Sequence, residues 1–484
     1  MEPLRSITKS KIICTMGPAT NTVEQIRKLA KLGMDCARIN FSHGTPEEKE
    51  ETFKRIREAD PTLAILCDIQ GPKIRVGRIK DGGVLIHPGH EIKVTTKDIL
   101  GTEECIPILY GPLPKEVKPG DFIFISDGII CLEVKGVKGG EIDCHILAGG
   151  FVSDRKGVNL PHTKISAKVP TEKDKKDLKL IAKLDPEYVA VSFVSSDMDM
   201  IAVKNLLAEY GNADLKLIAK IERPMAVENF DPILEVSDGI MVARGDLGVE
   251  LAPEDVLPAQ KMMIRKCNIA GKPIIVATQM LESMIKSPVP TRAEVSDVYN
   301  AIEDGADCVM LSAETAAGDY PDLAVAMMER IIRLSESLMP KRDPDDYDSD
   351  FETVAEILGH LVFNACKEFD DMKYEKGKVV CLTSSGYTAR MITKYRPGRP
   401  ILAVTEAQRT AKELRIVGGI EPIFIPGLNK VEGTLAKVKT ALKVCISYKF
   451  VDGSENVVVT GNLFDLRSQT NMLAIFSAKD VLDM

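Results

Sequence analysis

The sequence predicts a closed (β/α)₈ TIM barrel that carries an inserted small β-barrel domain and is followed by a separate α/β domain. Three observations predict this architecture. Eight short apolar runs alternate with helical patterns between residues 11 and 340, which is the strand count of a closed barrel rather than an open sheet. A stretch without helical periodicity interrupts the alternation after the third run. After residue 340 a second alternation begins.

The predicted barrel strands are apolar runs that end abruptly in polar residues, the pattern of buried parallel strands. In chain order they are KIICTMGP, CARINFSH, LAILCDIQG, YVAVSFVS, LKLIAKIE, GIMVARGDLG, PIIVATQML and DCVMLSAETA. The helical patterns between them include VEQIRKLAKLG and TRAEVSDVYNAIEDGA, and several open at Ser, Thr, Asp or Pro and close at Gly. Residues 1–70 and 168–340 are therefore expected to build the barrel.

Residues 71–167 are expected to form the inserted β domain. They contain many Gly and Pro residues and short β-branched runs such as VLIHPGHEIKVTT and DFIFISDGIICLEVKGV. Because the insertion follows the carboxyl end of a strand, it lies over the barrel face where active sites occur. We expect it to act as a lid that excludes water from the site beneath it.

The acidic, Pro-containing run MPKRDPDDYDSD predicts a linker between Leu338 and Asp350. Beyond it, residues 341–484 are expected to form the α/β domain. Its predicted strands are KVVCLTSSG, PILAVTE, PIFIPG, NVVVTG and MLAIFSA, and its first helix is ETVAEILGHLVFNACKEF.

One loop of this domain has the composition of a phosphate-binding turn. The run Thr383, Ser384, Ser385 and Gly386 lies between a predicted strand and a predicted helix, where backbone N–H groups and hydroxyls suit a phosphate. An ordinary helix cap with a turn glycine explains the same residues. No P-loop and no G-x-G-x-x-G occurs, so neither a Walker ATPase nor a dinucleotide fold is supported.

The composition limits the partners. The net charge is −8 and no long basic tract occurs, which argues against nucleic acid as the main partner. No run of 18 apolar residues and no signal peptide is found, so we expect no membrane span and a cytoplasmic location. The 11 cysteines form no C-x-x-C pair and indicate buried thiols rather than zinc ligands. His43 is interpreted as a packing or hydrogen-bonding residue.

The stretch from Leu215 to Gly248 carries the strongest chemical signal. Side chains two apart in a strand share a face, so Lys220 is expected beside Glu222, and Arg244 beside Asp246. Two carboxylates beside two cations suit Mg²⁺ and a phosphorylated substrate, since magnesium takes one or two carboxylates and completes its shell with water and phosphate oxygens. A structural ion-pair cluster is the alternative.

Other predicted strands also end in polar side chains, which favours a functional site over the ion-pair cluster. Because the carboxyl ends of the strands meet at one mouth, these side chains are expected to converge. They are Arg38, Asn40 and Ser42 on the second strand, Asp68 on the third, Thr278 on the seventh, and Ser312 with Glu314 on the eighth.

The whole chain resembles the pyruvate kinase family. The similar stretches, in the family's order, are CTMGPAT, ARINFSHG, CDIQGPKIR, KGVNLP, IAKIE, MVARGDLGVE, ATQMLESM, PTRAEVSDVYNAI and MLSAETAAGDYP. The resemblance implies a barrel, a β lid and a C-terminal effector domain, assembled as a homotetramer. It also implies transfer of the phosphoryl group of phosphoenolpyruvate to ADP, giving pyruvate and ATP in the last step of glycolysis, with Mg²⁺ or alternatively Mn²⁺.

The resemblance also implies roles for single residues. Glu222 and Asp246 would ligate the divalent metal, and Lys220 would face the phosphoryl group and the developing enolate. Arg38 would hold the substrate phosphate through its guanidinium fork. The remaining roles are carboxylate binding by Gly245 and Asp246, contact with the substrate methylene by Thr278, a proton path through Ser312 and Glu314, and nucleotide contacts by Arg75 and Lys173.

One departure concerns the monovalent cation. Many members read D-T-K-G-P-E-I-R and hold K⁺ with the equivalents of Asn40, Ser42, Asp68 and a threonine. Here that threonine is Ile69, and Lys73 replaces the glutamate. An ammonium group can supply the charge of a monovalent cation, so we expect activity without K⁺. The alternative is that Lys73 points to solvent and K⁺ still binds.

The effector and two rival functions remain open. A phosphorylated effector near Thr383 to Thr388 is expected, but fructose 1,6-bisphosphate is not favoured, because the chain has no tryptophan and its last loop reads Ser-Gln-Thr-Asn. Another barrel lyase or mutase acting on phosphoenolpyruvate would use the same carboxylates, but it needs neither a lid nor Arg75 and Lys173. A metabolite-binding regulator would be expected to have lost Lys220 or the metal ligands, which are all present.

Overall fold

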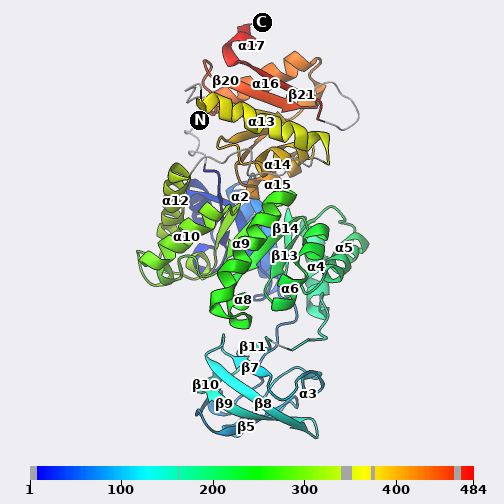
Figure 1. Ribbon diagram of the computed structural model, residues 1–484, viewed down its shortest axis with the longest axis vertical. Coiled ribbons are helices and arrows are strands. Elements are labelled where there is room, and N and C mark those ends of the chain that lie inside the picture. Colours follow the sequence, from blue (N-terminus) through cyan, green and yellow to red (C-terminus); the bar gives the residue numbers. More distant parts are fainter. Residues whose placement is uncertain (1–7, 162, 340–351, 372–376, 463–469, 484) are drawn as a thin grey trace.

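The computed structural model describes residues 8–161, 163–339, 352–371, 377–462 and 470–483. The molecule is elongated, with the barrel in the middle, the inserted β domain at one end and the C-terminal domain at the other (Figure 1). The predicted linker, apart from Met339, and the Ser-Gln part of the last loop fall outside the described residues.

The predicted barrel is confirmed. Eight parallel strands close on themselves, and each runs in the same direction as its neighbours. Around the barrel the order is β1 (Lys11–Thr15), β16 (Cys308–Leu311), β15 (Ile274–Ala277), β14 (Gly239–Ala243), β13 (Lys216–Ile221), β12 (Tyr188–Val191), β3 (Ala64–Ile69) and β2 (Met34–Asn40).

Helices surround the barrel and begin where the sequence signals them. Four of the described helices have capping boxes, formed by Thr45 with Glu48, Thr171 with Asp174, Ser196 with Asp199, and Thr291 with Glu294. The long helices are α1 (Val23–Leu32), α2 (Pro46–Ala59), α4 (Glu172–Leu184), α5 (Asp197–Glu209), α9 (Pro253–Ala270), α10 (Arg292–Asp304) and α12 (Pro321–Leu338). Shorter ones are α6 (Pro224–Glu228), α7 (Phe230–Val236), α8 (Arg244–Glu250) and α11 (Ala313–Ala316).

The barrel strands bury both faces. On β1, Ile12 and Cys14 belong to the core between strands and helices, whereas Ile13 belongs to the core inside the barrel. Ile416 of the C-terminal domain joins this inner core, and its carbonyl accepts a hydrogen bond from the Cys308 thiol at 3.1 Å. The C-terminal domain therefore closes the amino end of the barrel, and substrates can reach only the carboxyl ends of the strands.

The insertion between β3 and α4 is all-β apart from the short helix α3 (Leu113–Glu116), as predicted. It contains a six-stranded sheet and a two-stranded sheet around one apolar core (Figure 1). The larger sheet runs β11 (Val158–Asn159), β7 (Phe122–Ile125), β8 (Ile130–Lys138), β9 (Glu141–Ala148), β5 (Glu91–Thr95), β6 (Cys105–Pro107), and the smaller pairs β10 (Gly150–Ser153) with β4 (Gly83–Ile86). The exact boundaries 71 and 167 stay a prediction.

The C-terminal domain is α/β, as predicted. Its sheet order is β19 (Ile420–Phe424), β18 (Ile401–Thr405), β17 (Gly377–Leu382), β20 (Asn456–Gly461) and β21 (Met472–Ser477), and only β21 is antiparallel to its neighbour. Its helices are α13 (Val354–Asp371), α14 (Tyr387–Lys394), α15 (Gln408–Glu413), α16 (Thr434–Ser447) and α17 (Ala478–Asp483). Among the described residues of all domains, no helix is long and apolar enough to cross a membrane.

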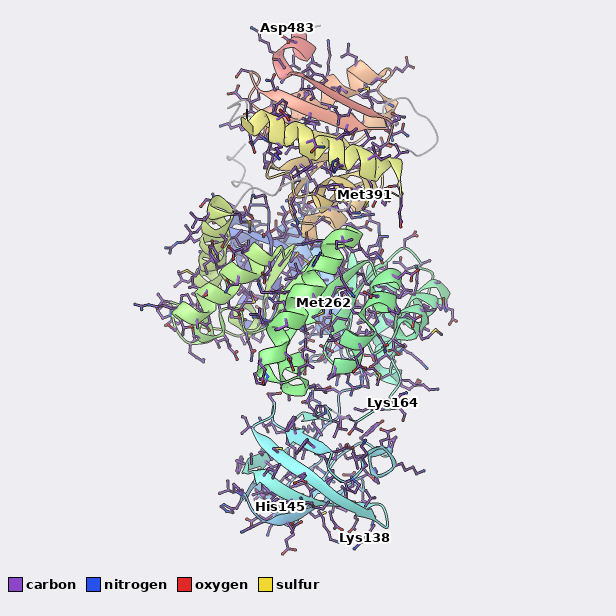
Figure 2. All side chains as sticks on the ribbon, viewed as in Figure 1. Lys138, His145, Lys164, Met262, Met391 and Asp483 are labelled. Atoms are coloured by element: carbon purple, nitrogen blue, oxygen red, sulfur yellow. The ribbon has the colours of Figure 1, made fainter. Side chains whose placement is uncertain are left out.

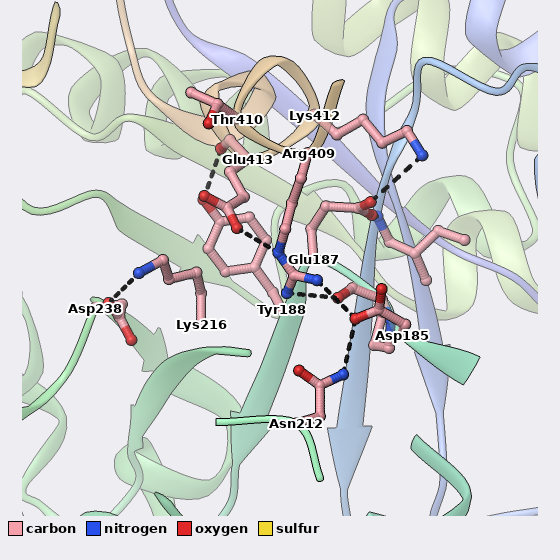
Figure 3. A network of polar contacts seen from close by, with 12 residues as sticks. Asp185, Glu187, Tyr188, Asn212, Lys216, Asp238, Arg409, Thr410, Lys412 and Glu413 are labelled. Carbon is pink, nitrogen blue, oxygen red and sulfur yellow. Dashed lines mark hydrogen bonds and ion pairs between the residues drawn. The ribbon is translucent and has the colours of Figure 1, made fainter. Parts of the chain in front are cut away.

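Polar contacts join the C-terminal domain to the amino end of the barrel (Figure 3). Arg409 lies 2.6 Å from an Asp185 oxygen, and the Tyr188 hydroxyl donates to the Glu413 carbonyl at 2.6 Å. Glu187 is 3% exposed and connects three elements, because it accepts from the Ile65 amide at 2.8 Å, pairs with both its oxygens to Arg57 at 2.7 Å, and lies 3.8 Å from Lys412.

Replacing Glu187 by alanine is expected to lower the free energy of unfolding by about 3 kcal/mol, because the change leaves the Arg57 guanidinium and the Ile65 amide without their buried partner. Glu187→Gln keeps an oxygen that can accept from the Ile65 amide, so its free energy of unfolding should fall by less. Thermal unfolding of both variants checks this, and equal midpoints for Glu187→Ala and the unaltered chain would contradict it.

Candidate active site

Lys220 lies at the centre of a buried polar cluster at the carboxyl ends of the barrel strands. Its ammonium group is 2.8 Å from Glu222 Oε1, 3.2 Å from Asp68 Oδ1 and 2.7 Å from the Ser192 hydroxyl. The expectation that Lys220 and Glu222 share a face therefore agrees with the contact observed. Strands β13, β3 and β12 supply these groups from adjacent positions in the barrel.

Arg38 joins the same cluster from β2. Its Nε is 2.8 Å from Asp68 Oδ2, and its Nη1 donates to the Thr15 hydroxyl at 2.9 Å. Burial alone would raise the pKa of the Asp68 carboxyl, but the charges of Lys220 and Arg38 outweigh it and hold that pKa below its usual value. Asp68 is thus an anion that fixes the two cations side by side.

The charge states of Lys220 and Glu222 follow from their surroundings. Burial opposes the charge on Lys220, but Asp68 and Glu222 together raise the pKa of its ammonium group above the ordinary value. Burial raises the pKa of Glu222 to about 7 despite Lys220, and the charge of Asp246 adds to the rise. Glu222 Oε2 also accepts the Phe193 amide at 2.6 Å. A cation beside Glu222 and Asp246 would relieve this mutual repulsion.

The expectation that Arg244 and Asp246 share a strand face is wrong. Strand β14 ends at Ala243, and both residues lie in the first turn of α8, where residues two apart point in different directions. Arg244 turns away from the cluster to Asp297 at 2.7 Å. Asp246 instead lies 3.6 Å from Lys73. The site therefore has one cation fewer than the strand pattern predicts.

Arg244 holds a strained loop that carries Thr278. Thr278 and Gln279 have φ values of +70° and +54°, which residues with side chains adopt at a cost. Arg244 Nη2 binds their carbonyls at 2.8 and 3.2 Å. The Gly245 amide donates to the Thr278 hydroxyl at 2.7 Å, and a Cβ on Gly245 would lie 3.3 Å from that oxygen. Gly245 and Thr278 are thus neighbours beside Asp246.

Glu314 ties the ends of two strands together. One of its oxygens accepts from the Ser312 amide at 2.7 Å and the other from the Leu281 amide at 3.2 Å. Burial raises the pKa of this carboxyl, and these amides oppose the rise. The buried Ser312 hydroxyl has no hydrogen-bond partner in the part of the chain that the structure describes.

The residues predicted for a monovalent cation are not all brought together by direct contacts. Asn40 Oδ1 accepts the Ser42 amide at 3.0 Å, and Asp68 binds Arg38 and Lys220. Lys73 contacts Asp246 instead, the proposed metal ligand. The replacement of K⁺ by Lys73 stays a prediction.

Arg75 and Lys173 lie between the barrel and the inserted domain. Arg75 Nη1 donates to the Arg155 carbonyl at 2.9 Å, and Lys173 donates to the Phe41 carbonyl at 2.7 Å. Burial, followed by the charges of Arg75, Lys49, Lys73 and Lys173, lowers the pKa of His43. These four cations therefore lie close enough to His43 to act on its charge. No group of three or more potential metal-ligating side chains is found among the described residues, His43 included.

The predicted effector residues other than Gly386 line a cavity of about 390 Å³ in the C-terminal domain. Thr383, Ser384, Ser385 and Thr388 all contribute to its wall. The Thr383 hydroxyl accepts the Gly386 amide at 3.0 Å, which is a capping contact, and Thr388 is hydrogen-bonded to Thr470. The same loop thus provides this capping contact at the start of helix α14 and lines the cavity, so the helix-cap interpretation and the phosphate-binding interpretation do not exclude each other.

Two residues of the cluster are absent from the sequence-based assignment. Ser192 follows β12 and connects Lys220 to Asp68, and Thr15 ends β1 and holds Arg38. Both are polar residues at strand ends, the same signal that identified Asp68. Asp297, which binds Arg244, lies within α10 and carries no such signal.

A closed barrel with this cluster at its mouth and an all-β domain inserted beside it has the architecture of a barrel enzyme, and its cations and carboxylates suit phosphoryl transfer. Comparisons with known proteins agree. A model of the pyruvate kinase barrel domain matches residues 7–325, and a model of the pyruvate kinase alpha/beta domain matches residues 363–476. The chain belongs to the pyruvate kinase family.

Relatives cover nearly the whole chain. Pyruvate kinase of Geobacillus stearothermophilus is 38% identical over 483 residues, which are 98% of this chain and 81% of that protein. Pyruvate kinase of Staphylococcus aureus (strain MRSA252) is 40% identical over 481 residues, with the same coverage. A crystal structure of a pyruvate kinase from Cryptosporidium parvum superposes with a TM-score of 0.89 at 35% identity, covering 97% of this chain and 96% of that one.

Proposed function

We propose that this site transfers the phosphoryl group of phosphoenolpyruvate to ADP and protonates the resulting enolate, giving pyruvate and ATP. The observation that carries the proposal is the buried cluster in which Lys220 contacts Glu222 and Asp68, and Asp68 contacts Arg38. Two fixed cations suit a transferring phosphoryl group, because charge grows on its oxygens and on the leaving enolate in the transition state.

Glu222 and Asp246 would hold the divalent cation, Mg²⁺ or alternatively Mn²⁺. The donor set fits, because Mg²⁺ takes one or two carboxylates and leaves its other positions to water and substrate oxygens. The raised pKa of Glu222, to which Asp246 contributes, supports this pairing of charges. When bound, such an ion polarises phosphoryl and carbonyl oxygens and neutralises their developing charge.

The other residues would position the substrate. The Arg38 guanidinium, held by Asp68 and Thr15, would bind the phosphate. Lys220 would stabilise the enolate oxygen. The Gly245 amide at the start of α8, together with Asp246 and Thr278, would receive the carboxylate and methylene end of the substrate. Ser312, positioned by Glu314, would pass a proton to the enolate carbon.

ADP would enter between the barrel and the lid. The four cations around His43, among them Arg75 and Lys173, favour a polyphosphate at this point. Closure of the lid would exclude water, which protects the phosphoryl group from hydrolysis. A lyase or mutase without a nucleotide has no use for this group of cations.

Activity is expected to require the divalent ion and not K⁺. The measurement is pyruvate formation from phosphoenolpyruvate and ADP with Mg²⁺, with EDTA, and with K⁺ replaced by tetramethylammonium. We expect no turnover with EDTA and comparable turnover with either monovalent cation, because Lys73 supplies a fixed positive charge beside Asp246. Turnover only in K⁺ would discard the role of Lys73 and keep the reaction. No turnover under any condition would contradict the proposed function.

The proposal also includes a regulatory site and an oligomeric state. The cavity lined by Thr383, Ser384, Ser385 and Thr388 would take a phosphorylated effector, and the chain would assemble as a homotetramer. Residues 1–70 and 168–340 would form the barrel domain, residues 71–167 the lid and residues 341–484 the effector domain.

A further inference from the structure

A cavity lies between the barrel and the C-terminal domain, at the end of the barrel opposite to the active site. Its volume is about 500 Å³, within the range of small-molecule sites. We call it the interdomain cavity and define it by Lys9, Glu336 and Met339 on the barrel side and by Phe363, Lys378 and Arg399 on the C-terminal side. It shares no lining residue with the cavity at Thr383.

The charges that line the interdomain cavity are unbalanced. Five cations face two carboxylates among its described lining residues: Lys9, Lys367, Lys378, Arg396 and Arg399 against Glu336 and Asp370. Both carboxylates are already engaged. Glu336 accepts the backbone amides of Lys9 and Ser10 at 3.0 and 2.6 Å, and Asp370 lies 2.5 Å from Arg399. Arg399 is thus paired with Asp370, and Arg396 is paired with Asp307 at 3.2 Å.

Two of these cations are in no ion pair with another described residue. Within the described ranges, no carboxylate lies within ion-pair distance of the ammonium groups of Lys9 and Lys378. Lys9 belongs to the segment before β1 and Lys378 to β17, so the two charges come from different domains. A bound anion could contact both at once and would link the two domains.

The loop that contains Arg396 adds a further donor. Arg396 Nη2 binds the Asn268 side chain at 2.6 Å, the Gly305 carbonyl at 2.7 Å and Asp307 Oδ1 at 3.2 Å, which fixes the guanidinium at the cavity. Its buried Nε donates to no group in the described part of the chain. Arg396 also has a φ of +50°, a backbone conformation that is strained for this residue and is common at binding sites.

We propose that the interdomain cavity binds a small organic anion with two or more negative charges. The ammonium groups of Lys9 and Lys378, one from each domain, select the charge, and the pre-positioned Arg396 donor selects a carboxylate or phosphate oxygen. Apolar side chains, among them Ile302, Met339, Phe363 and Ile401, line the rest of the cavity and favour an anion with a carbon skeleton. Because both domains contribute, binding stabilises their contact at the amino end of the barrel.

The test is isothermal titration calorimetry of the full chain without divalent metal, with glycerol 3-phosphate in one arm and citrate in the other. Binding in the first arm alone indicates a phosphate ligand, and binding in the second alone a carboxylate ligand. Lys9→Gln or Lys378→Gln should each weaken the binding ~10-fold, since each removes one charge-assisted contact. The double variant that carries both substitutions should not bind the probe, and the probe should no longer raise its melting temperature.

Lys138→Gln is the matched control, because Lys138 lies at the tip of the inserted domain, far from this cavity (Figure 2). It makes the same change of charge and should bind like the unaltered chain. Neither Lys9 nor Lys378 belongs to the active site, so retained pyruvate formation shows that the variants fold. Identical isotherms for the double variant and the unaltered chain, or no binding of either probe by the unaltered chain, would overturn the proposal.

Discussion

Replacing Lys220 by methionine is expected to lower kcat by at least about 1,000-fold, because it removes a fixed charge whose contribution grows as the phosphoryl group leaves the enolate. The ammonium group is 2.8 Å from Glu222 and 3.2 Å from Asp68, and its raised pKa keeps it charged. The KM for phosphoenolpyruvate should change much less than kcat. Steady-state kinetics with phosphoenolpyruvate and ADP give both numbers.

The control for this variant separates charge from structure. Ser192→Ala removes the hydroxyl that binds both Lys220 and Asp68 but leaves the ammonium group in place. It should lower kcat by only about 10-fold, since it loosens the position of Lys220. Binding of Mn²⁺, followed by its electron paramagnetic resonance signal, should survive in Lys220→Met, because Glu222 and Asp246 remain. Near-normal turnover of Lys220→Met would remove Lys220 from the mechanism.

The barrel could be predicted from the sequence because its strands are buried on both faces. Runs such as IICT and AILCDI carry no polar residue until they reach the carboxyl end, so strand number and strand end can both be counted. The same rule placed Lys220, Asp68 and Arg38 together, since they lie near the carboxyl ends of β13, β3 and β2, and only β12 stands between β13 and β3. Convergence at one mouth is a property of the topology and needs no knowledge of side-chain packing.

Contacts that depend on where a strand stops could not be predicted in this way. The run GIMVARGDLG is apolar through Ala243, and the change to a helix at Arg244 reverses the expected direction of its side chain. Its partner Asp297 comes from α10, 53 residues further along the chain. The positive φ of Thr278 likewise results from tertiary contacts, because its own sequence, ATQM, contains no glycine that would indicate a turn.

Arg38→Lys is expected to lower kcat/KM for phosphoenolpyruvate by about 100-fold or more, although it keeps the positive charge. The guanidinium binds Asp68 through Nε and Thr15 through Nη1. These two contacts orient the remaining nitrogen, Nη2. A lysine has one nitrogen and cannot make these contacts while it also binds a phosphate. If Arg38 only binds the substrate, the variant should mainly show a higher KM. If Arg38 also stabilises the charge that develops during transfer, the variant should mainly show a lower kcat.

Thr15→Val provides the matched control for Arg38→Lys. It removes one anchor of the guanidinium, the hydroxyl at 2.9 Å from Nη1, and leaves both Arg38 and its 2.8 Å contact with Asp68 intact. Thr15→Val should lower kcat/KM for phosphoenolpyruvate by about 10-fold, because the guanidinium donor is less well oriented. If Arg38→Lys retains the catalytic efficiency of the unaltered chain, charge alone is sufficient at this position, and the fork geometry fixed by Asp68 and Thr15 has no part in phosphate binding.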